Sequence, residues 1–204
     1  MKAFRHGRIL KFEGESRLKP CLIIVSAPSG AGKSTLCARL VEEYPEIIEN
    51  VSFTTRPPRN KEDDGVDYFF VDMAEFEEKK NRSFFVEHAM VHDHCYGVSF
   101  AQIETAIKSG RPIILDIDVQ GAKTLLNKFP DALTIFVLPP SIEELERRLK
   151  SRDQGKTNNY MLRIKNAASE MAQAVHFKHQ LINENLEEAY AQFKKVVETA
   201  LRNS

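Results

Sequence analysis

The feature that most constrains this chain is the glycine-rich stretch of residues 27–35, which directly follows an apolar run at residues 22–25. This order predicts a buried strand, a tight loop and the start of a helix. The loop ends in Gly-Lys-Ser at residues 32–34, the closing half of the phosphate-binding loop pattern. Because Gly30 and Gly32 allow the backbone to turn its N–H groups inward around an anion, the chain is predicted to bind nucleotide phosphates.

The residue types of the loop predict how a triphosphate is held. Lys33 is expected to reach the β- and γ-phosphates, and Ser34 to ligate Mg²⁺. The N-terminus of the following helix adds a partial positive charge. The first glycine of the pattern is replaced by alanine, a mild departure at a tight turn. The predicted phosphate-binding residues are Ala27, Pro28, Ser29, Gly30, Ala31, Gly32, Lys33, Ser34 and Thr35.

The charge composition narrows the classes of ligand. The chain has 204 residues, with 29 Lys and Arg against 29 Asp and Glu, so its formal net charge is zero. A general nucleic-acid or membrane binder would carry a basic surplus. No apolar run approaches the ~20 residues of a membrane span. We therefore expect no nucleic-acid or membrane partner, and an anionic substrate held by locally clustered Arg and Lys.

The first residues and the cysteines bear on the cellular compartment. Residues 1–20 carry scattered basic residues without an uninterrupted apolar segment, which argues against a secretory signal and predicts a flexible leader outside the fold. Cys21, Cys37 and Cys95 are odd in number and far apart. They predict free thiols in a reducing compartment rather than a disulfide framework, so we expect a cytoplasmic protein.

Continuous apolar runs alternate with helical patterns along most of the chain. Runs at residues 112–115 and 133–138 join the one at 22–25, which predicts an α/β fold with a parallel sheet covered on both faces. Residues 51–100 differ, because short alternating pieces there predict a small mixed lobe of short strands with one helix at 73–80.

The last part of the chain predicts three helices and a short strand. The helices are expected at residues 141–151, 160–174 and 186–201, and the first begins with a Ser-x-x-Glu capping box. The strand is expected at 181–183. Ligands of parallel sheets bind at the carboxyl ends of the strands. Asp116, Asp118 and Asn183 all follow or end strands, so we expect them to share one edge with the phosphate loop.

The mixed lobe carries two arginines suited to a second phosphate. Arg56 and Arg59 flank a proline-stiffened turn, and their guanidinium groups can each form bidentate bonds to a phosphate. Further short patterns follow in Gly-Val-Asp-Tyr at 65–68, Phe-Val-Glu-His-Ala at 85–89 and Tyr-Gly at 96–97.

Together these motifs resemble those of guanylate kinases. The phosphate loop, Thr-Thr-Arg-x-Pro-Arg, Gly-x-Asp-Tyr, Phe-x-Glu-x-Ala, Tyr-Gly and Leu-Asp-Ile-Asp-x-Gln-Gly-Ala occur in that family's order. Each motif is short, but jointly they are specific, and the resemblance covers about residues 21–201. It implies a P-loop NTPase fold with a central parallel sheet flanked by helices, a small mixed α/β GMP-binding lobe and a helical lid.

The resemblance also implies the reaction and the domain organisation. The reaction is ATP-dependent phosphorylation of GMP to GDP with Mg²⁺ as cofactor, dGMP being a further substrate, in purine nucleotide metabolism and GMP recycling. We expect a monomer or a small homo-oligomer. After the leader, residues 21–204 form one guanylate kinase-like domain, with its core at 21–51, 101–140 and 175–204, its GMP-binding lobe at 52–100 and its lid region at 141–174.

The residues implied for GMP fall into three groups. Those that grip its phosphate are Arg56, Arg59, Tyr68 and Tyr96. Those around the guanine are Ser52, Glu87 and Asp118. Asp116 stands beside them, where it either helps hold the waters of Mg²⁺ or forms structural hydrogen bonds.

The residues implied for ATP and for catalysis complete the site. Asn183 lies where the family approaches the adenine of ATP, whose phosphates occupy the loop. The predicted catalytic residues are Lys33 and the lid arginines Arg148, Arg152 and Arg163. Arg147, beside Arg148, is an alternative candidate for the catalytic role of Arg148. Arg152 is alternatively a solvated surface charge without a catalytic role.

Hydrogen-bonding chemistry agrees with the assignment of Glu87. Guanine presents its N1–H and 2-amino donors on one edge, and one carboxylate can accept from both. Adenine presents a bare N1 acceptor there, which would leave a buried carboxylate unpaired. Sites of this kind discriminate by about 10⁴-fold or more.

One residue departs from the family pattern near the guanine. The family usually has Ser or Thr after Tyr-Gly, but this chain has Val98, which cannot donate a hydrogen bond. The loss of one neutral hydrogen bond costs about 0.5–1.5 kcal/mol, so GMP is expected to bind roughly threefold to tenfold more weakly.

Two other functions fit parts of the sequence. Guanylate-kinase-like domains that bind peptides without catalysis usually lose residues of the phosphate loop, whereas this chain keeps its glycines, Lys33 and Ser34. A kinase for another nucleoside monophosphate or a phosphorylated sugar would also use Arg56, Arg59 and Tyr68. Only Ser52, Glu87 and Asp118 argue for guanine.

Overall fold

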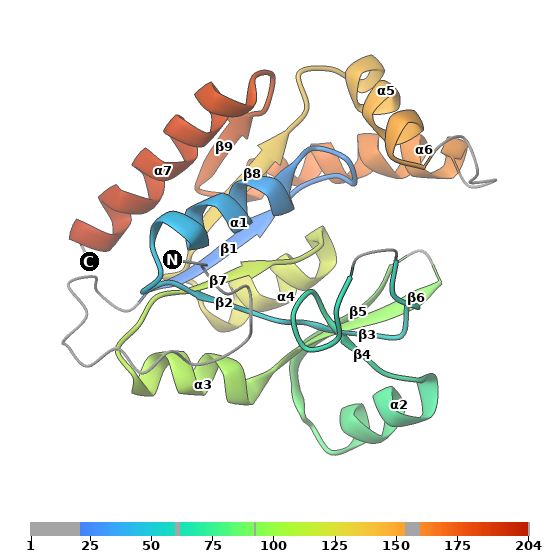
Figure 1. Cartoon of the computed structure of the whole chain (residues 1–204), viewed down its shortest axis with the longest axis vertical. Helices are drawn as coiled ribbons and strands as arrows, with labels where there is room; N and C mark the ends of the chain where they lie inside the picture. The colour runs from blue at the N-terminus through green and yellow to red at the C-terminus, as the bar shows by residue number, and fades with distance from the viewer. Residues whose placement is uncertain (1–20, 60–61, 92, 154–159, 204) are drawn as a thin grey trace.

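A five-stranded parallel sheet forms the centre of the protein in the computed structural model, which describes residues 21–59, 62–91, 93–153 and 160–203 (Figure 1). The strand order is β2-β7-β1-β8-β9, and every neighbouring pair is parallel. The strands are β1 Leu22–Ser26, β2 Ile48–Glu49, β7 Ile113–Asp116, β8 Leu133–Leu138 and β9 His179–Ile182. The predicted parallel α/β fold is confirmed.

Helices cover both faces of this sheet because its strands are apolar on both sides. Alternate residues of β1 point to opposite faces, so Ile23 and Val25 join one core cluster and Ile24 joins the other. The first cluster contains side chains of α1 Lys33–Glu43 and α7 Leu186–Asn203. The second contains side chains of α3 Phe100–Lys108, α4 Val119–Lys128 and the 3₁₀ helix η1 Ala172–His176.

A second sheet lies beside the first, in order β4-β3-β6-β5 (Figure 1). Its strands are β3 Phe53–Thr54, β4 Phe69–Phe70, β5 Phe85–Val91 and β6 His94–Ser99. The helix α2 Met73–Asn81 packs Phe76 into an aromatic cluster with Phe53 and Phe85. Short strands with one helix were predicted for this part of the chain.

Two further helices, α5 Ile142–Asp153 and α6 Tyr160–Met171, pack together through Leu145, Leu149 and Ala167. The predicted capping box is only half formed. The hydroxyl of Ser141 accepts from the backbone N–H of Glu144 at 3.2 Å. The Glu144 carboxylate does not reach back to the start of the helix, because Arg147 and Arg148 both donate to it.

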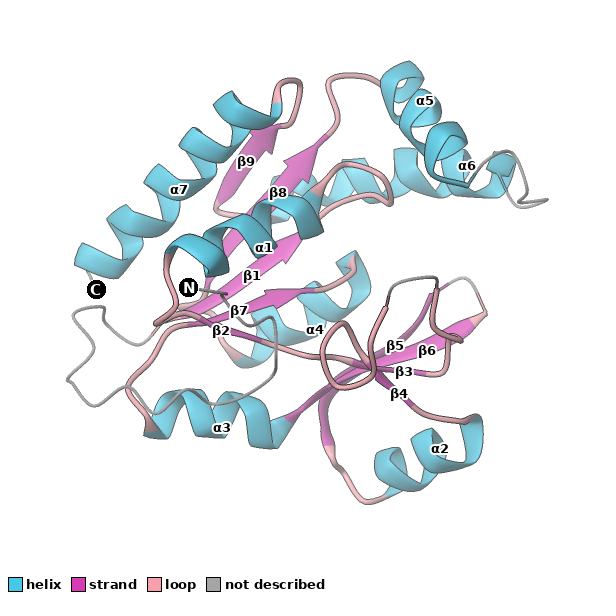
Figure 2. Cartoon of the chain, in the orientation of Figure 1, coloured by secondary structure: helices cyan, strands magenta, loops and turns pink. Residues whose placement is uncertain are grey.

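Two sequence-based boundaries near the site were wrong by a few residues. The helix predicted at 160–174 ends at Met171 and continues as the 3₁₀ turn η1. The last strand, predicted at 181–183, is His179–Ile182, because pairing with β8 sets its length. Asn183 therefore lies just beyond the strand, at the edge to which β1, β7, β8 and β9 all point (Figure 2).

Within the described part of the chain, no helix combines the length and the apolar character that crossing a lipid bilayer would require.

Candidate functional site

The loop between β1 and α1 has the backbone of an anion-binding turn. Gly30 and Gly32 have φ values of 92° and 93°, and the N–H of Ala31 donates to the carbonyl of Pro28 at 3.1 Å. Alanine at position 30 would bring its Cβ to 2.9 Å from the Leu149 side chain of α5. The positive φ therefore favours glycine here, and an added Cβ would also require the Leu149 side chain to shift.

Asn183 is packed against this loop. Its side-chain amide donates to the carbonyl of Ala31 at 2.7 Å, and the residue is buried. Arg148 of α5 donates from Nη2 to the carbonyl of Asn183 at 2.9 Å and from Nε to Glu144 at 2.8 Å. The structure thus brings two sequence-predicted residues to the phosphate loop, with Asn183 holding the loop itself.

Lys33 points to the end of β7. Its ammonium forms an ion pair with Asp116 and donates to the carbonyl of Ile117 at 2.6 Å. Both side chains of the ion pair are partly exposed, so the charges remain accessible to a ligand. Asp116 therefore contacts a residue of the phosphate loop directly.

The arginine and the tyrosines predicted for a second phosphate form one cluster. The Arg56 guanidinium lies 5.3 Å from the centre of the Tyr68 ring, and the rings of Tyr68 and Tyr96 meet edge to face at 5.9 Å. Glu62, which sequence reasoning missed, accepts from Arg56 at 2.9 Å and from the backbone N–H of Arg59 at 2.7 Å. Glu62 therefore links the side chain of Arg56 to the backbone of Arg59.

Burial changes the acidity of this cluster. It raises the pKa of Tyr68, and the negative charge of Asp116 raises it further, so the phenol stays a hydrogen-bond donor at neutral pH. Asp116 therefore pairs with Lys33 of the phosphate loop and also acts electrostatically on Tyr68 of the arginine-tyrosine cluster.

Glu87 of β5 has a carboxylate whose pKa is strongly shifted by burial. Only 4% of the residue is exposed, and its Oε2 has no hydrogen-bond partner among the described residues. Burial, reinforced by the negative charge of Asp118 and partly opposed by Lys128, raises the pKa of Glu87 to about 8. A buried acceptor without a partner is costly, so this geometry favours a ligand that donates hydrogen bonds.

The other residues predicted around the base lie at the starts of local structures. Asp118 is the N-cap of α4, and its Oδ1 accepts from the N–H of Gln120 at 2.7 Å. Ser52 is buried, and its hydroxyl accepts from the side-chain amide of Asn50 at 3.0 Å. Sequence reasoning missed Asn50, whose Oδ1 is a second buried acceptor without a partner among the described residues.

Glu170 of α6 is a further residue that the sequence did not reveal. Its carboxylate accepts from the backbone N–H of Ser29 in the phosphate loop. Burial raises the pKa of Glu170, and Asp118 raises it further, while Lys33 opposes the shift. The negative charge of Asp118 therefore raises the pKa of both Glu87 and Glu170.

For the remaining predicted arginines, the structure gives fewer contacts or no description of the side chain. Arg59 is exposed and near Glu62, and Arg147 is 71% exposed on α5. Arg152 lies within the bounds of α5 and Arg163 within α6, but their side chains are outside the described residues. Their predicted roles stay predictions.

The donors at this edge fit Mg²⁺. Ser34 is exposed in the first turn of α1, and the carboxylate of Asp116 lies beside Lys33. Mg²⁺ prefers such hard oxygen donors and usually keeps waters and substrate phosphates in its shell. Among the described residues, no group of three or more His, Cys, Asp or Glu side chains could hold a metal by itself. The residues therefore suit an ion that arrives with phosphates.

Val98 lies within the core and not at an open surface. It is fully buried and packs in the same cluster as Val86 and Ile24. The weaker GMP binding expected from this residue stays a prediction.

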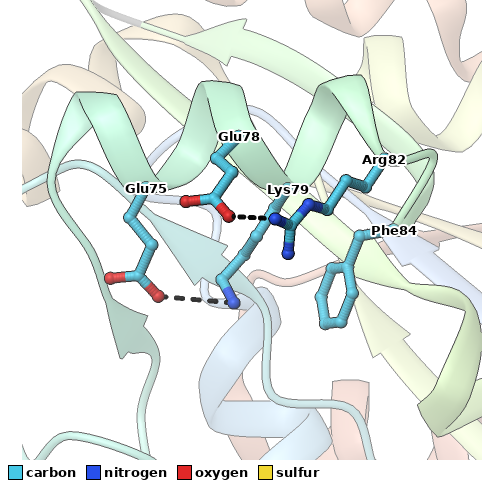
Figure 3. Close-up of a pocket in the computed structure, with 5 residues that line it drawn as sticks. All are labelled: Glu75, Glu78, Lys79, Arg82 and Phe84. Carbon is cyan, nitrogen blue, oxygen red and sulfur yellow. Dashed lines mark ion pairs between the residues drawn. The ribbon is translucent and has the colours of Figure 1, made fainter.

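A pocket of about 490 Å³ lies elsewhere, lined by residues of α2 and of the segment that follows it (Figure 3). Its charged lining residues are already paired, Lys79 with Glu75 at 3.3 Å and Arg82 with Glu78 at 2.8 Å. None of the residues predicted from the sequence lines it. We therefore place the candidate site at the strand ends instead.

The chain is similar to known proteins over most of its length. The family model described as guanylate kinase matches residues 19–200. A protein of Bdellovibrio bacteriovorus named guanylate kinase is 45% identical over 184 residues, which cover 90% of this chain and all of that protein. One of Polaromonas is 47% identical over 176 residues, 86% of this chain and 85% of that protein. The crystal structure of guanylate kinase from Anaplasma phagocytophilum has a TM-score of 0.77 at 31% identity, covering 93% of this chain and 91% of that one.

Proposed function

The chain belongs to the guanylate kinase family, and from that premise we propose that it transfers the γ-phosphoryl group of ATP to GMP and to dGMP through the residues described above. Membership of the family implies a nucleotide-binding phosphotransferase that makes GDP from GMP with ATP. The assignment of individual residues, the use of dGMP and the metabolic setting are our proposals.

The observation that carries the assignment is the buried carboxylate of Glu87, one oxygen of which has no partner in the described part of the chain. Its Oε2 is buried without a hydrogen-bond partner among the described residues. The N1–H and 2-amino groups of guanine would supply the missing donors, while the N1 of adenine would not. We therefore assign base recognition to Glu87, with Ser52 and Asp118 beside it.

The chemistry asked of the protein is mainly positioning and charge neutralisation. Lys33 would leave Asp116 for the β- and γ-phosphates, and Arg56 with Tyr68 would orient the acceptor phosphate. Mg²⁺, bound with ATP near Ser34, would neutralise phosphate charge. Arg148 on α5, with Arg152 and Arg163, would approach the transferring group as the lid closes and excludes water.

The binding of GMP is expected to strengthen as the pH rises from 6.5 to 8. Glu87 must be ionised to accept from guanine, but its raised pKa of about 8 leaves it mostly protonated in the free protein at lower pH. GMP binding therefore releases a proton, and the KM for GMP is expected to fall by up to about tenfold per pH unit until pH 8. Steady-state kinetics with saturating ATP measures this.

The control for the pH profile is Glu87→Gln, which has no carboxylate to titrate. Its KM for GMP should be flat over the same interval. A wild-type profile as flat as that of the variant would contradict the assignment of Glu87.

Acceptor preference tests the proposed substrate class. None of the residues assigned to GMP is placed at the ribose, so dGMP is expected to be used within about tenfold of GMP in kcat/KM. AMP and UMP should be poorer by about 10⁴-fold. A coupled assay of ADP formation with each acceptor measures all four values, and comparable use of AMP would refute guanine recognition.

We also propose a role in purine nucleotide metabolism and GMP recycling within the cytoplasm. Cys21, Cys37 and Cys95 are free thiols in the structure, which is typical of proteins in a reducing compartment.

A further inference from the structure

Gly121 lies against the carboxylate of Glu87. It is in the first turn of α4 and buried. A Cβ atom built on Gly121 would lie 2.8 Å from Oε2 and 2.9 Å from both Cδ and Oε1 of Glu87. Real Cβ atoms do not approach other atoms so closely, so any side chain at position 121 requires the Glu87 carboxylate, α4 or β5 to move.

The helix has little freedom to move away. The carboxylate of Asp118 caps its first turn by accepting from the N–H of Gly121 at 3.2 Å. At the other end, Lys128 donates from Nζ to the carbonyl of Val86 at 2.5 Å, which ties α4 to β5 next to Glu87. Between these ends, Ala122 and Leu125 are fully buried in the core.

The strand is held equally firmly. The pairing of β5 with β6 shifts register between Phe85 and Glu87, and Val86, between them, is buried in the core. Such a bulge re-aims the neighbouring side chains. With Glu87 only 4% exposed, its carboxylate cannot swing into solvent without leaving the buried position from which it would read a base.

Backbone conformation does not explain a glycine here. Gly121 is not among the glycines with positive φ, and it lies in a regular helix. In a helix, alanine is more favourable than glycine. The close approach of the carboxylate is the feature of the structure that requires glycine.

We propose that Gly121 is a specificity-determining positioning residue, whose missing side chain leaves the space in which the Glu87 carboxylate faces the guanine of GMP. The inference rests on the proposed function of Glu87. Gly121 itself does not touch the substrate. It acts through Glu87, so its substitution should change recognition of the acceptor base while leaving the use of ATP intact.

The test is Gly121→Ala, with Thr124→Ala as the matched control. Thr124 is an exposed residue of the same helix, so its replacement changes helix propensity without approaching Glu87. We expect Gly121→Ala to raise the KM for GMP about tenfold or more and to narrow the preference for GMP over AMP, because a displaced carboxylate loses at least one hydrogen bond. The KM for ATP should change less than about twofold, as should every parameter of Thr124→Ala.

A double-variant cycle shows whether the effect passes through Glu87. Glu87→Asp shortens the side chain by one methylene group and makes room for a Cβ at position 121. In that background, Gly121→Ala should raise the KM for GMP by less than about threefold. An equally large effect in both backgrounds would overturn the proposal, as would a wild-type KM for GMP in Gly121→Ala.

Glu87→Gln, measured in parallel, separates this inference from the proposed function. If Glu87→Gln keeps the wild-type preference for GMP, the proposed reading of guanine fails. If Glu87→Gln loses the preference but Gly121→Ala does not, only the inference about Gly121 fails. Melting temperatures of all variants accompany the kinetics, and a large drop for Gly121→Ala that Glu87→Asp does not relieve would also overturn it.

Discussion

Replacing Lys33 with alanine is expected to lower kcat by about 10³-fold or more, because its ammonium is the cation of the loop that can face the transferring phosphate. In the structure this ammonium forms an ion pair with Asp116 and donates a hydrogen bond to the carbonyl of Ile117, at the end of β7. Both partners of the ion pair are partly exposed, so losing the pair should cost little stability. Coupled kinetics and a melting curve measure the two quantities.

Lys178→Ala is the matched control for this variant. The ammonium of Lys178 also donates to backbone carbonyls, those of Pro130 at 3.1 Å and Ala132 at 2.9 Å. Lys178 precedes β9, so it lies at the amino end of the strands, away from the candidate site. Its removal should leave kcat within about twofold. Wild-type turnover by a folded Lys33→Ala variant would refute the role of the loop.

Glu87→Gln is expected to lose most of the preference for GMP over AMP, about 10²-fold or more in the ratio of kcat/KM values. An amide has one acceptor and one donor where the carboxylate has two acceptors, so it cannot accept both hydrogen bonds of guanine. The kcat at saturating GMP should fall less than the ratio, because the phosphate contacts remain. Kinetics with both acceptors, in the same coupled assay, give the ratio.

Stability provides an internal check on Glu87→Gln. The pKa of Glu87 is raised in the folded protein, so its burial costs stability above the pKa of the unfolded chain, near 4.5, and this cost is fully developed above about pH 8. The variant should therefore melt no lower than the wild type at pH 8. Glu78→Gln, on the exposed face of α2, should leave both the preference and the stability unchanged. A Glu87→Gln protein that still rejects AMP would show that another group reads the base.

The fold was largely predictable because its strands are continuous apolar runs. The limits of β8 were predicted to the residue, since a pair of prolines ends its apolar run. The short strands β2 and β3 were not individually predicted. Two residues carry no detectable periodicity, and such strands form only because partner strands lie beside them.

The site was predictable where a motif carries its own chemistry, and not where a side chain acts through tertiary contact. The positive φ angles of Gly30 and Gly32 and the grouping of Arg56 with Tyr68 follow such motifs, while the roles of these residues stay predictions. Glu62, Asn50 and Glu170 could not be predicted, because nothing in their neighbouring sequence indicates which distant group they meet. Glu170 lies more than a hundred residues from Ser29, and only the packing of α6 brings its carboxylate to the loop.

A crystal structure with GMP and a non-hydrolysable ATP analogue tests the central claim most directly, since that claim places both substrates in one cleft. We expect the guanine N1 and 2-amino nitrogens within hydrogen-bonding distance of the Glu87 carboxylate, about 2.7–3.2 Å. The GMP phosphate should lie on Arg56 and Tyr68, facing a γ-phosphate held by Lys33. A GMP bound away from Glu87, or an analogue whose phosphates lie outside residues 27–35, would contradict it.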